Sequence, residues 1–542
     1  MSQLTRLGAL VATGALTATG LVASVTAPAQ AVGTDARPAT IGATWLEGQL
    51  TNGIFHYPDS GYGAYNDYGL SLDAGLSLVA LGGHDAEVST ISDSMASAVG
   101  ADHYITGEEF GDTGSTYAGA VAKAAVFAKA AGDDPASFGG VDLVSRLEAQ
   151  VRTASPNEGR LFDTSTSGDY ANTLGQAFAA NALSAASSSE AASVIDFLLD
   201  QQCSAGFFRL SFSAEGAADQ TCDAATSPSP DTDATAMAVL QLSQVASPTQ
   251  AVSDAIDQAE AWLLGAQHAD GSFGGGASTE AANTNSTGLA GWALGELGDD
   301  AAATKAATWV RSHQIDEQSA CPSKISDQTG ALGYDDAAVA AGRADGITLA
   351  TLDQWRRSTA PTLPVLQWAP AASSALSITG PTGYLKAGSV ATYRVSGAAP
   401  GDKVCVSGIG SSRRVVAPAS GSFAVALTMP SATATRVATA AVHGSSDSLL
   451  VQVLGARKLT VTPAHRTKHR GTKLRVVVSG LAPGEHVRLR YRGVTKRTGL
   501  ADPTGHFTRV IRVGHKLGKA RIVAWGEFSS IRHGRAVIRV VR

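Results

Sequence analysis

The sequence predicts a mainly α protein in which a closed ring of six α-hairpins, an (α/α)6 toroid, precedes two small all-β sandwiches. An amphipathic outer helix followed by an apolar inner helix recurs six times, at roughly 40–60 residues per unit, which is typical of helical arrays. The inner helices are apolar on nearly every side, and no polar helix closes either end of the array. A closed ring is therefore expected, because an open array needs polar caps.

Residues 261–297 show the repeating unit most clearly. The helix predicted over Ala251–Gln267 has an apolar stripe at Ile256, Ala259 and Leu263. A glycine-rich turn ends it, and a second helix over Asn285–Leu297 is apolar on nearly every side, which predicts burial.

The other units are aligned on this one. The inner helices are expected to start at a polar residue followed by an Ala- and Leu-rich run: Asp73, Ser115, Asn172, Asp233, Asn285 and Asp345. The outer helices are expected over Ile41–Leu50, Ala86–Val99, Val141–Val151, Ala191–Gln202, Ala251–Gln267 and Ala301–His313.

Three turns carry a further pattern at the end of an outer helix. Gln267, Gly271 and Phe273 are spaced as Q-x-x-x-G-x-F, and Gln202 and Gln49 begin turns of the same spacing. The region 38–360 thus resembles the terpenoid cyclase and protein prenyltransferase α/α-toroid superfamily, with its prenyltransferase and squalene-cyclase repeat. The resemblance implies the fold more than an activity, because one fold hosts many functions.

The segment around Asp231 and Asp233 is the strongest catalytic candidate. Asp231, Asp233, Thr235 and Ala236 match the D-x-D-D-T-A pattern of squalene–hopene-type cyclases, in which an acid protonates an alkene, but Ala234 replaces one Asp. The alternative role of Asp233 is a helix N-cap, which would also explain Asp73, Asn285 and Asp345. The N-cap is favoured, and no catalytic residue is assigned.

Other superfamily activities lack their residues. The inner helices carry no His or Cys for zinc, the G-C-G-E-Q thioester motif is absent, and few aromatic residues are available to stabilise cations. No metal site is predicted, and the cofactor is left unknown.

Residues 1–31 have the features of a cleaved secretory signal peptide. Arg6 precedes an apolar stretch over 7–25, and Ala29-Gln30-Ala31 is a small-residue cleavage site. A transmembrane anchor is the alternative, but no second apolar segment follows. The mature protein, 32–542, is expected to be secreted, extracellular or attached to the cell wall.

The composition divides the mature chain. Residues 32–362 form the expected toroid, 363–372 a proline-bearing linker, and 373–456 and 457–542 two immunoglobulin-like sandwiches with alternating strands.

The last of these domains, 457–542, has 21 Lys and Arg residues against three Asp and Glu residues, whereas the rest of the chain has 20 against 44. The basic domain is expected to attract an anionic envelope polymer, lipid headgroups or extracellular DNA. The alternatives are a solubilising face and docking on the acidic toroid of the same molecule. It has no aromatic platform for sequence-specific nucleic-acid binding.

The four cysteines are expected to form disulfides in an oxidising compartment. Cys203 and Cys222 bracket one loop and form the preferred pair, whereas a bridge between Cys321 and Cys405 would join two different domains.

The loops before the inner helices are rich in Tyr and Asp, which suits a binding rim. The expected ligand-binding residues are Tyr62, Tyr65, Asp67, Asp112, Asp169, Asp231 and Asp233.

The favoured function is a non-catalytic small-ligand-binding or cell-surface protein, and cobalamin-binding toroids are the nearest analogy. The alternatives are a degenerate terpene-cyclase-like enzyme, a carbohydrate-active (α/α)6 enzyme with paired carboxylates, and a structural adhesin.

Overall fold

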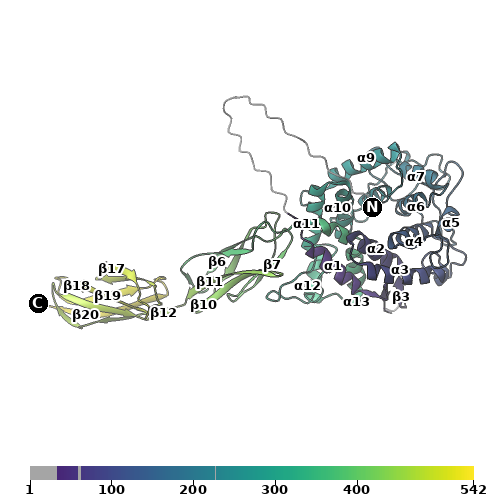
Figure 1. Ribbon diagram of the computed structural model, residues 1–542. Coiled ribbons are helices and arrows are strands. Elements are labelled where there is room, and N and C mark those ends of the chain that lie inside the picture. Colours follow the sequence, from purple (N-terminus) through teal and green to yellow (C-terminus); the bar gives the residue numbers. More distant parts are fainter. Residues whose placement is uncertain (1–32, 59–62, 226) are drawn as a thin grey trace, which may run out of the picture. The chain divides into compact units, whose positions relative to one another are not determined.

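The computed structural model describes residues 33–58, 63–225 and 227–542, and Gly33–Arg542 forms one compact unit. The proposed signal peptide, 1–31, and Tyr62 lie outside the described residues. The described chain consists of a helical part followed by a β-sheet part, as the sequence predicts (Figure 1). Among the described residues, no helix has the length and apolar character needed to cross a bilayer.

Five inner helices and one short 3-10 helix pack around the centre of the helical part. The inner helices are α2 (Tyr68–Leu81), α4 (Ala118–Ala131), α6 (Thr173–Ala185), α8 (Thr232–Leu242) and α10 (Thr284–Leu297), and the short helix is η3 (Leu363–Trp368). Each packs against the next, and η3 packs against both α10 and α2, so the inner elements form a closed circuit. Their many alanines allow the close approach.

The outer helices lie at the periphery of the same circuit (Figure 1). They are α1 (Arg37–Glu47), α3 (Asp85–Gly100), α5 (Leu143–Glu148), α7 (Ala191–Asp200), α9 (Gln250–Ala266) and α11 (Asp300–His313). Their apolar stripes face the inner helices, and one buried cluster that includes Leu46, Ile91, Val194 and Leu263 joins the two layers.

Smaller elements fill the loops between these helices. Strands β1 (Leu50–Thr51), β2 (Ile54–Tyr57) and β3 (Tyr65–Asp67) form a sheet before α2. The remaining elements are the 3-10 turns η1 (Glu108–Phe110) and η2 (Cys222–Ala224) and the helices α12 (Asp336–Asp345) and α13 (Leu349–Thr359).

Glutamine side chains connect neighbouring repeats through the backbone. The amide nitrogen of Gln267 donates to Gly271 in its own turn, at 3.2 Å, and to Ala302 of the next outer helix, at 2.9 Å. Gln202 makes the same two bonds to Gly206 and Ala255. These bonds give the recurring glutamine a structural role, because its amide links the turn after one outer helix to the backbone of the next outer helix.

The last repeat uses the same device to join the first. Gln314 donates to Gly330, at 3.3 Å, and to Pro38 of α1, at 2.8 Å. In the third repeat the bonds come instead from Gln176 on the inner helix, which reaches Gly159 and Val194. The sequence pattern did not reveal these two copies, because one turn is longer and the other takes its glutamine from a different helix.

Several predicted helix starts are wrong. Asp231, not Asp233, caps α8 by accepting a bond from the backbone of Ala234 at 2.9 Å. Asn283, not Asn285, caps α10, and Asp73 lies inside α2, which Asp67 caps. Each true cap has the extended or non-helical backbone that a cap needs, and composition cannot distinguish it from a polar residue that follows a few positions later.

The sixth inner element also differs from the prediction. Asp345 ends α12 rather than starting an inner helix, and the stretch predicted as a linker contains η3 instead. Leu363, Val365 and Leu366 are fully buried. Pro364 at the start of this short helix is compatible with a 3-10 turn, and the surrounding apolar side chains complete the core.

Two sandwiches of paired sheets form the rest of the chain. In the first, β5 (Tyr384–Lys386), β11 (Ser445–Leu454), β10 (Ala434–Val442), β7 (Lys403–Ser407) and β8 (Arg413–Val416) form one sheet. The other sheet contains β4 (Ser377–Thr379), β6 (Val390–Ser396) and β9 (Phe423–Thr428), and the two share a core around Tyr393.

The second sandwich repeats this arrangement. Its larger sheet contains β12 (Arg457–Lys458), β20 (Arg532–Val541), β19 (Gly518–Trp525), β16 (His486–Tyr491) and β17 (Val494–Leu500), and β14 (Thr467–His469) pairs with β20. The smaller sheet contains β13 (Thr460–Pro463), β15 (Lys473–Ser479) and β18 (His506–Arg512). Buried residues alternate with exposed or half-buried ones along most of β19 and β20, which fits one face packed on a core.

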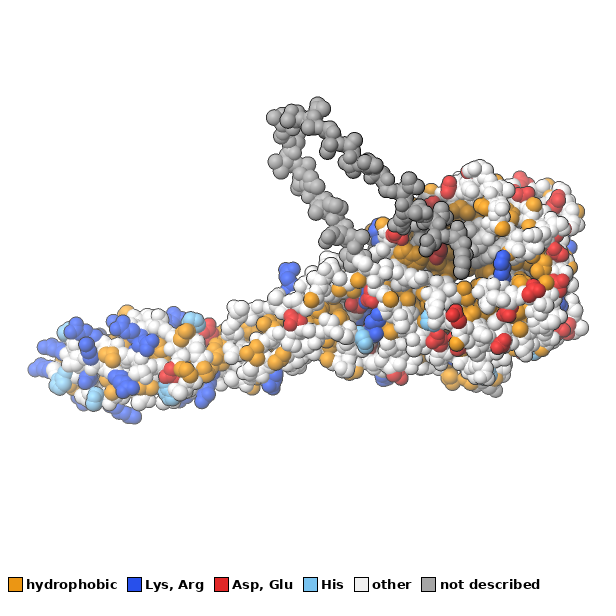
Figure 2. Space-filling view, in the orientation of Figure 1, with side chains coloured by type: hydrophobic (Ala, Val, Ile, Leu, Met, Phe, Trp, Pro, Cys, Tyr) orange, Lys and Arg blue, Asp and Glu red, His pale blue; other side chains and the backbone are white. Residues whose placement is uncertain are grey.

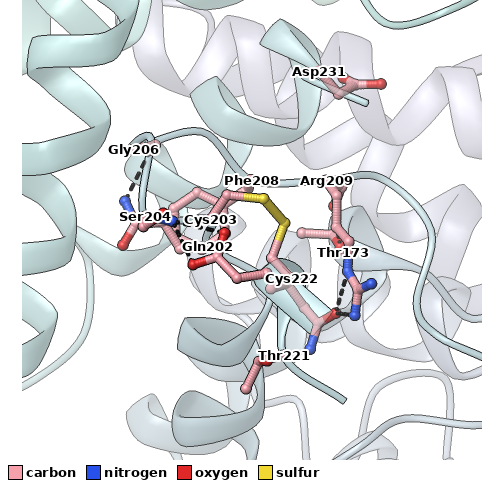
Figure 3. Close-up of a disulfide and its surroundings, with 12 residues drawn as sticks. Thr173, Gln202, Cys203, Ser204, Gly206, Phe208, Arg209, Thr221, Cys222 and Asp231 are labelled. Atoms are coloured by element: carbon pink, nitrogen blue, oxygen red, sulfur yellow. Dashed lines mark hydrogen bonds between the residues drawn. A yellow bond between two sulfur atoms is a disulfide. The ribbon is translucent and has the colours of Figure 1, made fainter. Parts of the chain in front are cut away.

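The structure contains two disulfides and no free cysteine in its described part. The preferred pair, Cys203–Cys222, is bonded and lies beside the turn that Gln202 and Gly206 hold (Figure 3). The other bond, Cys321–Cys405, ties the helical part to strand β7 of the first sandwich. Arg311 adds to that attachment by pairing with Asp402, at 2.5 Å.

Candidate functional site

The helical domain contains a cavity of about 930 Å³ between its inner helices. Phe178, Met237, Leu240, Leu289 and Trp292 supply its larger apolar side chains. Within each inner helix the lining residues recur three or four positions apart, so they occupy one face of that helix. This volume is within the range of small-molecule pockets.

The cavity is lined by the later turns of the inner helices, and its exposed residues lie at their C-terminal ends. Ala130, Ala186, Gln244 and Glu296 are exposed, whereas residues deeper in the same helices are buried. The mouth is therefore at the C-terminal ends of the inner helices. Figure 2 shows hydrophobic side chains gathered in a hollow of the helical domain, with acidic side chains beside it.

The lining is strongly acidic at this mouth. It includes five carboxylates and one basic residue, Lys129, and the five are Asp133, Asp134, Asp142, Glu148 and Glu296. In the part of the chain that the structure describes, none of the five forms an ion pair. Neutral groups hold them in place: Trp292 donates to Glu296 at 3.1 Å, and Ser188 donates to Glu148 at 2.6 Å.

Two effects add to this negative potential. The backbone and side chain of Ser145 donate to Asp142, and these bonds lower the pKa of that carboxyl, so its charge persists into more acidic solution. The C-terminal ends of the inner helices also carry the partial negative charge of the helix dipole. The mouth thus favours a cation, while the walls favour an apolar group.

Polar groups deeper in the cavity are already paired. Asp73 forms an ion pair with Lys123 at 2.5 Å, and Asn181 donates to Gln241 at 2.9 Å. The unpaired charge is consequently concentrated at the mouth, and an apolar ligand body would meet mainly neutral walls.

The residues predicted from sequence lie elsewhere, in the loops before the inner helices. Tyr65 stacks on Tyr57, with ring centres 4.8 Å apart, and is 45% exposed. Asp67 caps α2 and pairs with Arg357. Both residues therefore contribute to a local aromatic and charged cluster before α2.

Asp112 and Asp169 hold the loops before α4 and α6. Bonds from Ser165 and Thr166 lower the pKa of Asp112 to about 2, with a smaller contribution from Tyr117. Asp169 pairs with Arg160 at 3.0 Å. Each carboxylate already has several partners, which suits a loop anchor.

Asp233 differs from these four residues. Burial raises its pKa to about 6, and the charge of Asp231 adds to the rise, although the nearby hydroxyl of Ser286 opposes it. Its Oδ1 atom has no hydrogen-bond partner. Asp231 itself is occupied in capping α8. A carboxyl group with a pKa near 6 is mostly protonated below pH 6, and in that form it can donate a proton.

None of the six described residues in the predicted set lines the cavity. The sequence prediction did not include the cavity residues, because it placed the site in loops whereas the cavity is lined mainly by one face of each inner helix. A signal was present in the sequence: the bulky and polar residues of α6, α8 and α10 recur at helical spacing on otherwise Ala-rich helices, as in Phe178–Asn181 and Leu289–Trp292. The described residues contain no group of three or more side chains able to hold a metal.

No family model matches the chain, and no curated protein matches it. Among solved structures, this chain is similar to type II terpene cyclase MstE from Scytonema, at 16% identity and a TM-score of 0.41, covering 62% of this chain and 97% of that one. A protein from Actinoplanes gives 16% identity and a TM-score of 0.41, covering 61% of this chain and 98% of that one.

A different solved structure matches part of the chain. Adhesin InvE from Yersinia pseudotuberculosis is 17% identical, with a TM-score of 0.18, over 31% of this chain. This chain spans 60% of the length of that adhesin. At these identities and TM-scores the likenesses assign neither a family nor an activity.

Proposed function

We propose that the protein is an exported ligand-binding protein whose helical domain, an α/α toroid, holds one small molecule with an apolar body and a positively charged head. The two β-sheet domains are interpreted as immunoglobulin-like modules. Export is supported by the signal-like residues 1–31 and by the two disulfides, because disulfides persist in oxidising compartments.

One observation carries the ligand proposal: an apolar cavity opens through five carboxylates that have no cationic partner in the described chain. A bound cation would relieve the repulsion among these carboxylates. Its apolar body would bury surface against Phe178, Met237 and Trp292, at about 25 cal/mol per Å².

Paired probes test this proposal. A long-chain primary amine and the carboxylate of equal chain length are titrated into the full-length protein at pH 7, and binding is followed by calorimetry and by tryptophan fluorescence. The amine is expected to bind at least tenfold more tightly, with the preference shrinking as salt increases. Equal binding of both probes would refute the charged-head requirement, and binding of neither would refute the site.

Substitutions locate the bound probe. Glu296→Gln keeps an acceptor for Trp292 but removes a charge at the mouth, so it should weaken amine binding alone. Ala185→Trp should fill the cavity and weaken both probes. Glu158→Gln, at an exposed glutamate outside the cavity lining, is the matched control and should leave both affinities unchanged.

A second candidate function rests on Asp233. Asp233 does not line the cavity, but its raised pKa of about 6 and its unpartnered oxygen support the terpene-cyclase-like alternative. The protein would then convert an acyclic isoprenoid to a cyclic product, and Asp233→Asn would abolish the product. Absence of any product with the native protein would remove this candidate.

A further inference from the structure

The last β domain, residues 457–542, carries a large excess of positive charge, and all of its residues are described. It has 21 Lys and Arg residues but only three carboxylates: Glu485, Asp502 and Glu527. Most of its basic side chains therefore need partners from outside the domain or remain hydrated.

The three carboxylates do little to neutralise this charge. Glu485 is fully buried and pairs with Arg532, at 2.6 and 2.7 Å, in the only ion pair of this domain. Asp502 accepts bonds from the Thr504 and His506 backbone in its own turn. The outer faces of the domain consequently keep their charge.

The larger sheet arranges basic side chains in rows on its outer face. Lys519 and Arg521 on β19 alternate with buried residues, as do Arg535 and Arg539 on β20. Lys519 lies directly opposite Arg539 in the register. Neighbouring strands are about 4.8 Å apart and alternate residues about 7 Å apart, so these side chains form a grid of cations. Figure 2 shows blue side chains gathered over this domain.

The smaller sheet is basic as well. Lys473 and Arg475 on β15 and Arg512 on β18 point away from the core. A planar membrane can contact one face of a sandwich at a time, whereas a flexible chain can follow both. Charge on both faces therefore favours a flexible linear polyanion.

The side chains offer no platform for stacking bases. Trp525, on the outer face of β19, has the guanidinium groups of Arg488 and Arg490 over its ring, at 5.6 and 5.0 Å. The large hydrophobic side chains exposed in this domain are aliphatic, such as Val537. Single-stranded nucleic acids are held largely by aromatic stacking, so a polymer without bases fits better.

We infer that residues 457–542 bind a flexible, base-free phosphodiester polymer of the cell envelope, held by the cation rows of its outer sheet faces. The basic surface of residues 457–542 is separate from the cavity of the helical domain, so this inference and the ligand-binding proposal do not depend on each other.

The full-length protein and purified poly(glycerol phosphate) provide the test. Binding is measured by calorimetry at several salt concentrations from about 50 to 300 mM, over which counterion release changes the affinity measurably. If about six phosphates are contacted, log K should fall with log salt at a slope of about −4, by analogy with single strands. Affinity that does not change with salt would overturn the inference.

Charge reversal locates the surface. The variant combines Lys519→Glu, Arg521→Glu, Arg535→Glu and Arg539→Glu, all at exposed positions of β19 and β20. It is expected to lose at least tenfold in affinity at 100 mM salt and to show a slope shallower by about 3. The variant must have the same melting temperature and the same far-UV circular dichroism spectrum as the native protein, so that a loss of affinity does not come from unfolding.

The matched control makes the same charge change in the first β domain: Lys386→Glu, Arg394→Glu, Arg413→Glu and Arg436→Glu, all at exposed positions. An equal loss in the control would overturn the inference, because net charge alone would then explain binding. Tighter binding to duplex DNA or to anionic lipid vesicles than to the polymer would likewise overturn it and reassign the surface to that partner.

Discussion

The contact that closes the helical circuit is expected to be highly sensitive to one methyl group. Gly330 has φ +102°, and a Cβ atom there would overlap the backbone carbonyl of Ile41 on α1. Gly330→Ala therefore adds two costs. A non-glycine residue at positive φ costs about 1–2 kcal/mol, and forcing an extra carbon into a packed contact costs about 1–3 kcal/mol. We expect a loss of about 2–5 kcal/mol in unfolding free energy.

Gly298→Ala separates these two costs. Gly298 has φ +97°, almost the same backbone conformation, but an added Cβ would have no neighbour within 4 Å. Only the backbone cost should appear there, about 1–2 kcal/mol. Urea unfolding followed at 222 nm reports the helical domain, since the helices of the described chain all lie before residue 369.

The comparison of the two variants decides the outcome. A larger loss for Gly330→Ala than for Gly298→Ala is expected because only Gly330 touches the first outer helix. Equal losses would refute the reasoning, since they would mean that the contact between the last and first repeats contributes nothing. Gly271→Ala, which would crowd the carbonyl of Lys305, shows whether an internal contact has a similar cost.

Three further predictions concern buried charge and the disulfide between domains. The pKa of Asp233 is raised from 3.8 to about 6, so the contribution of this group to stability is present below pH 4 and is lost as the pH rises through 6. Asp233→Asn should therefore be more stable than the native protein at pH 8, by up to about 3 kcal/mol. Urea titrations should show no advantage of the variant at pH 3.5. Glu485→Gln should lower the stability of the last domain by about 3–5 kcal/mol by leaving Arg532 buried without its partner, and a shift in thermal melting under 1 °C would contradict this. Replacing both Cys321 and Cys405 by Ser removes a disulfide between residues 84 positions apart. The chain-entropy model predicts a loss of about 4–5 kcal/mol, which should lower the melting temperature. An unchanged melting temperature would show that the other contacts hold the helical part and the first β domain together without the disulfide.

The local composition of the chain was enough to predict the coarse architecture. Apolar stripes at helical spacing, such as Ile256–Ala259–Leu263, predicted the outer helices to within a few residues of α9 and α11. Alternating residues after position 372 predicted β-strands, and β19 and β20 lie in this part of the chain. These patterns succeed because each element must bury one face, and that requirement is visible within 10 or so residues.

Positions that depend on distant residues were not predictable in the same way. The choice of Asp231 over Asp233 as the cap of α8 depends on where the chain turns. The burial of Leu363 and Leu366 depends on the gap left between α10 and α2. The cavity is lined by five inner helices, and their lining residues extend from Asp73 to Glu296, more than 200 positions along the chain.

By itself, the sequence determined the helical and β-sheet parts, the preferred disulfide partner of Cys203 and the charge of the last domain, because periodicity, spacing and charge are properties of the chain. Tertiary structure alone decided the closing contact at Gly330, the cavity with its acidic mouth, and the high pKa of Asp233. Closure, enclosed volume and desolvation all arise when segments far apart in sequence come together, and no local pattern encodes which atoms will meet.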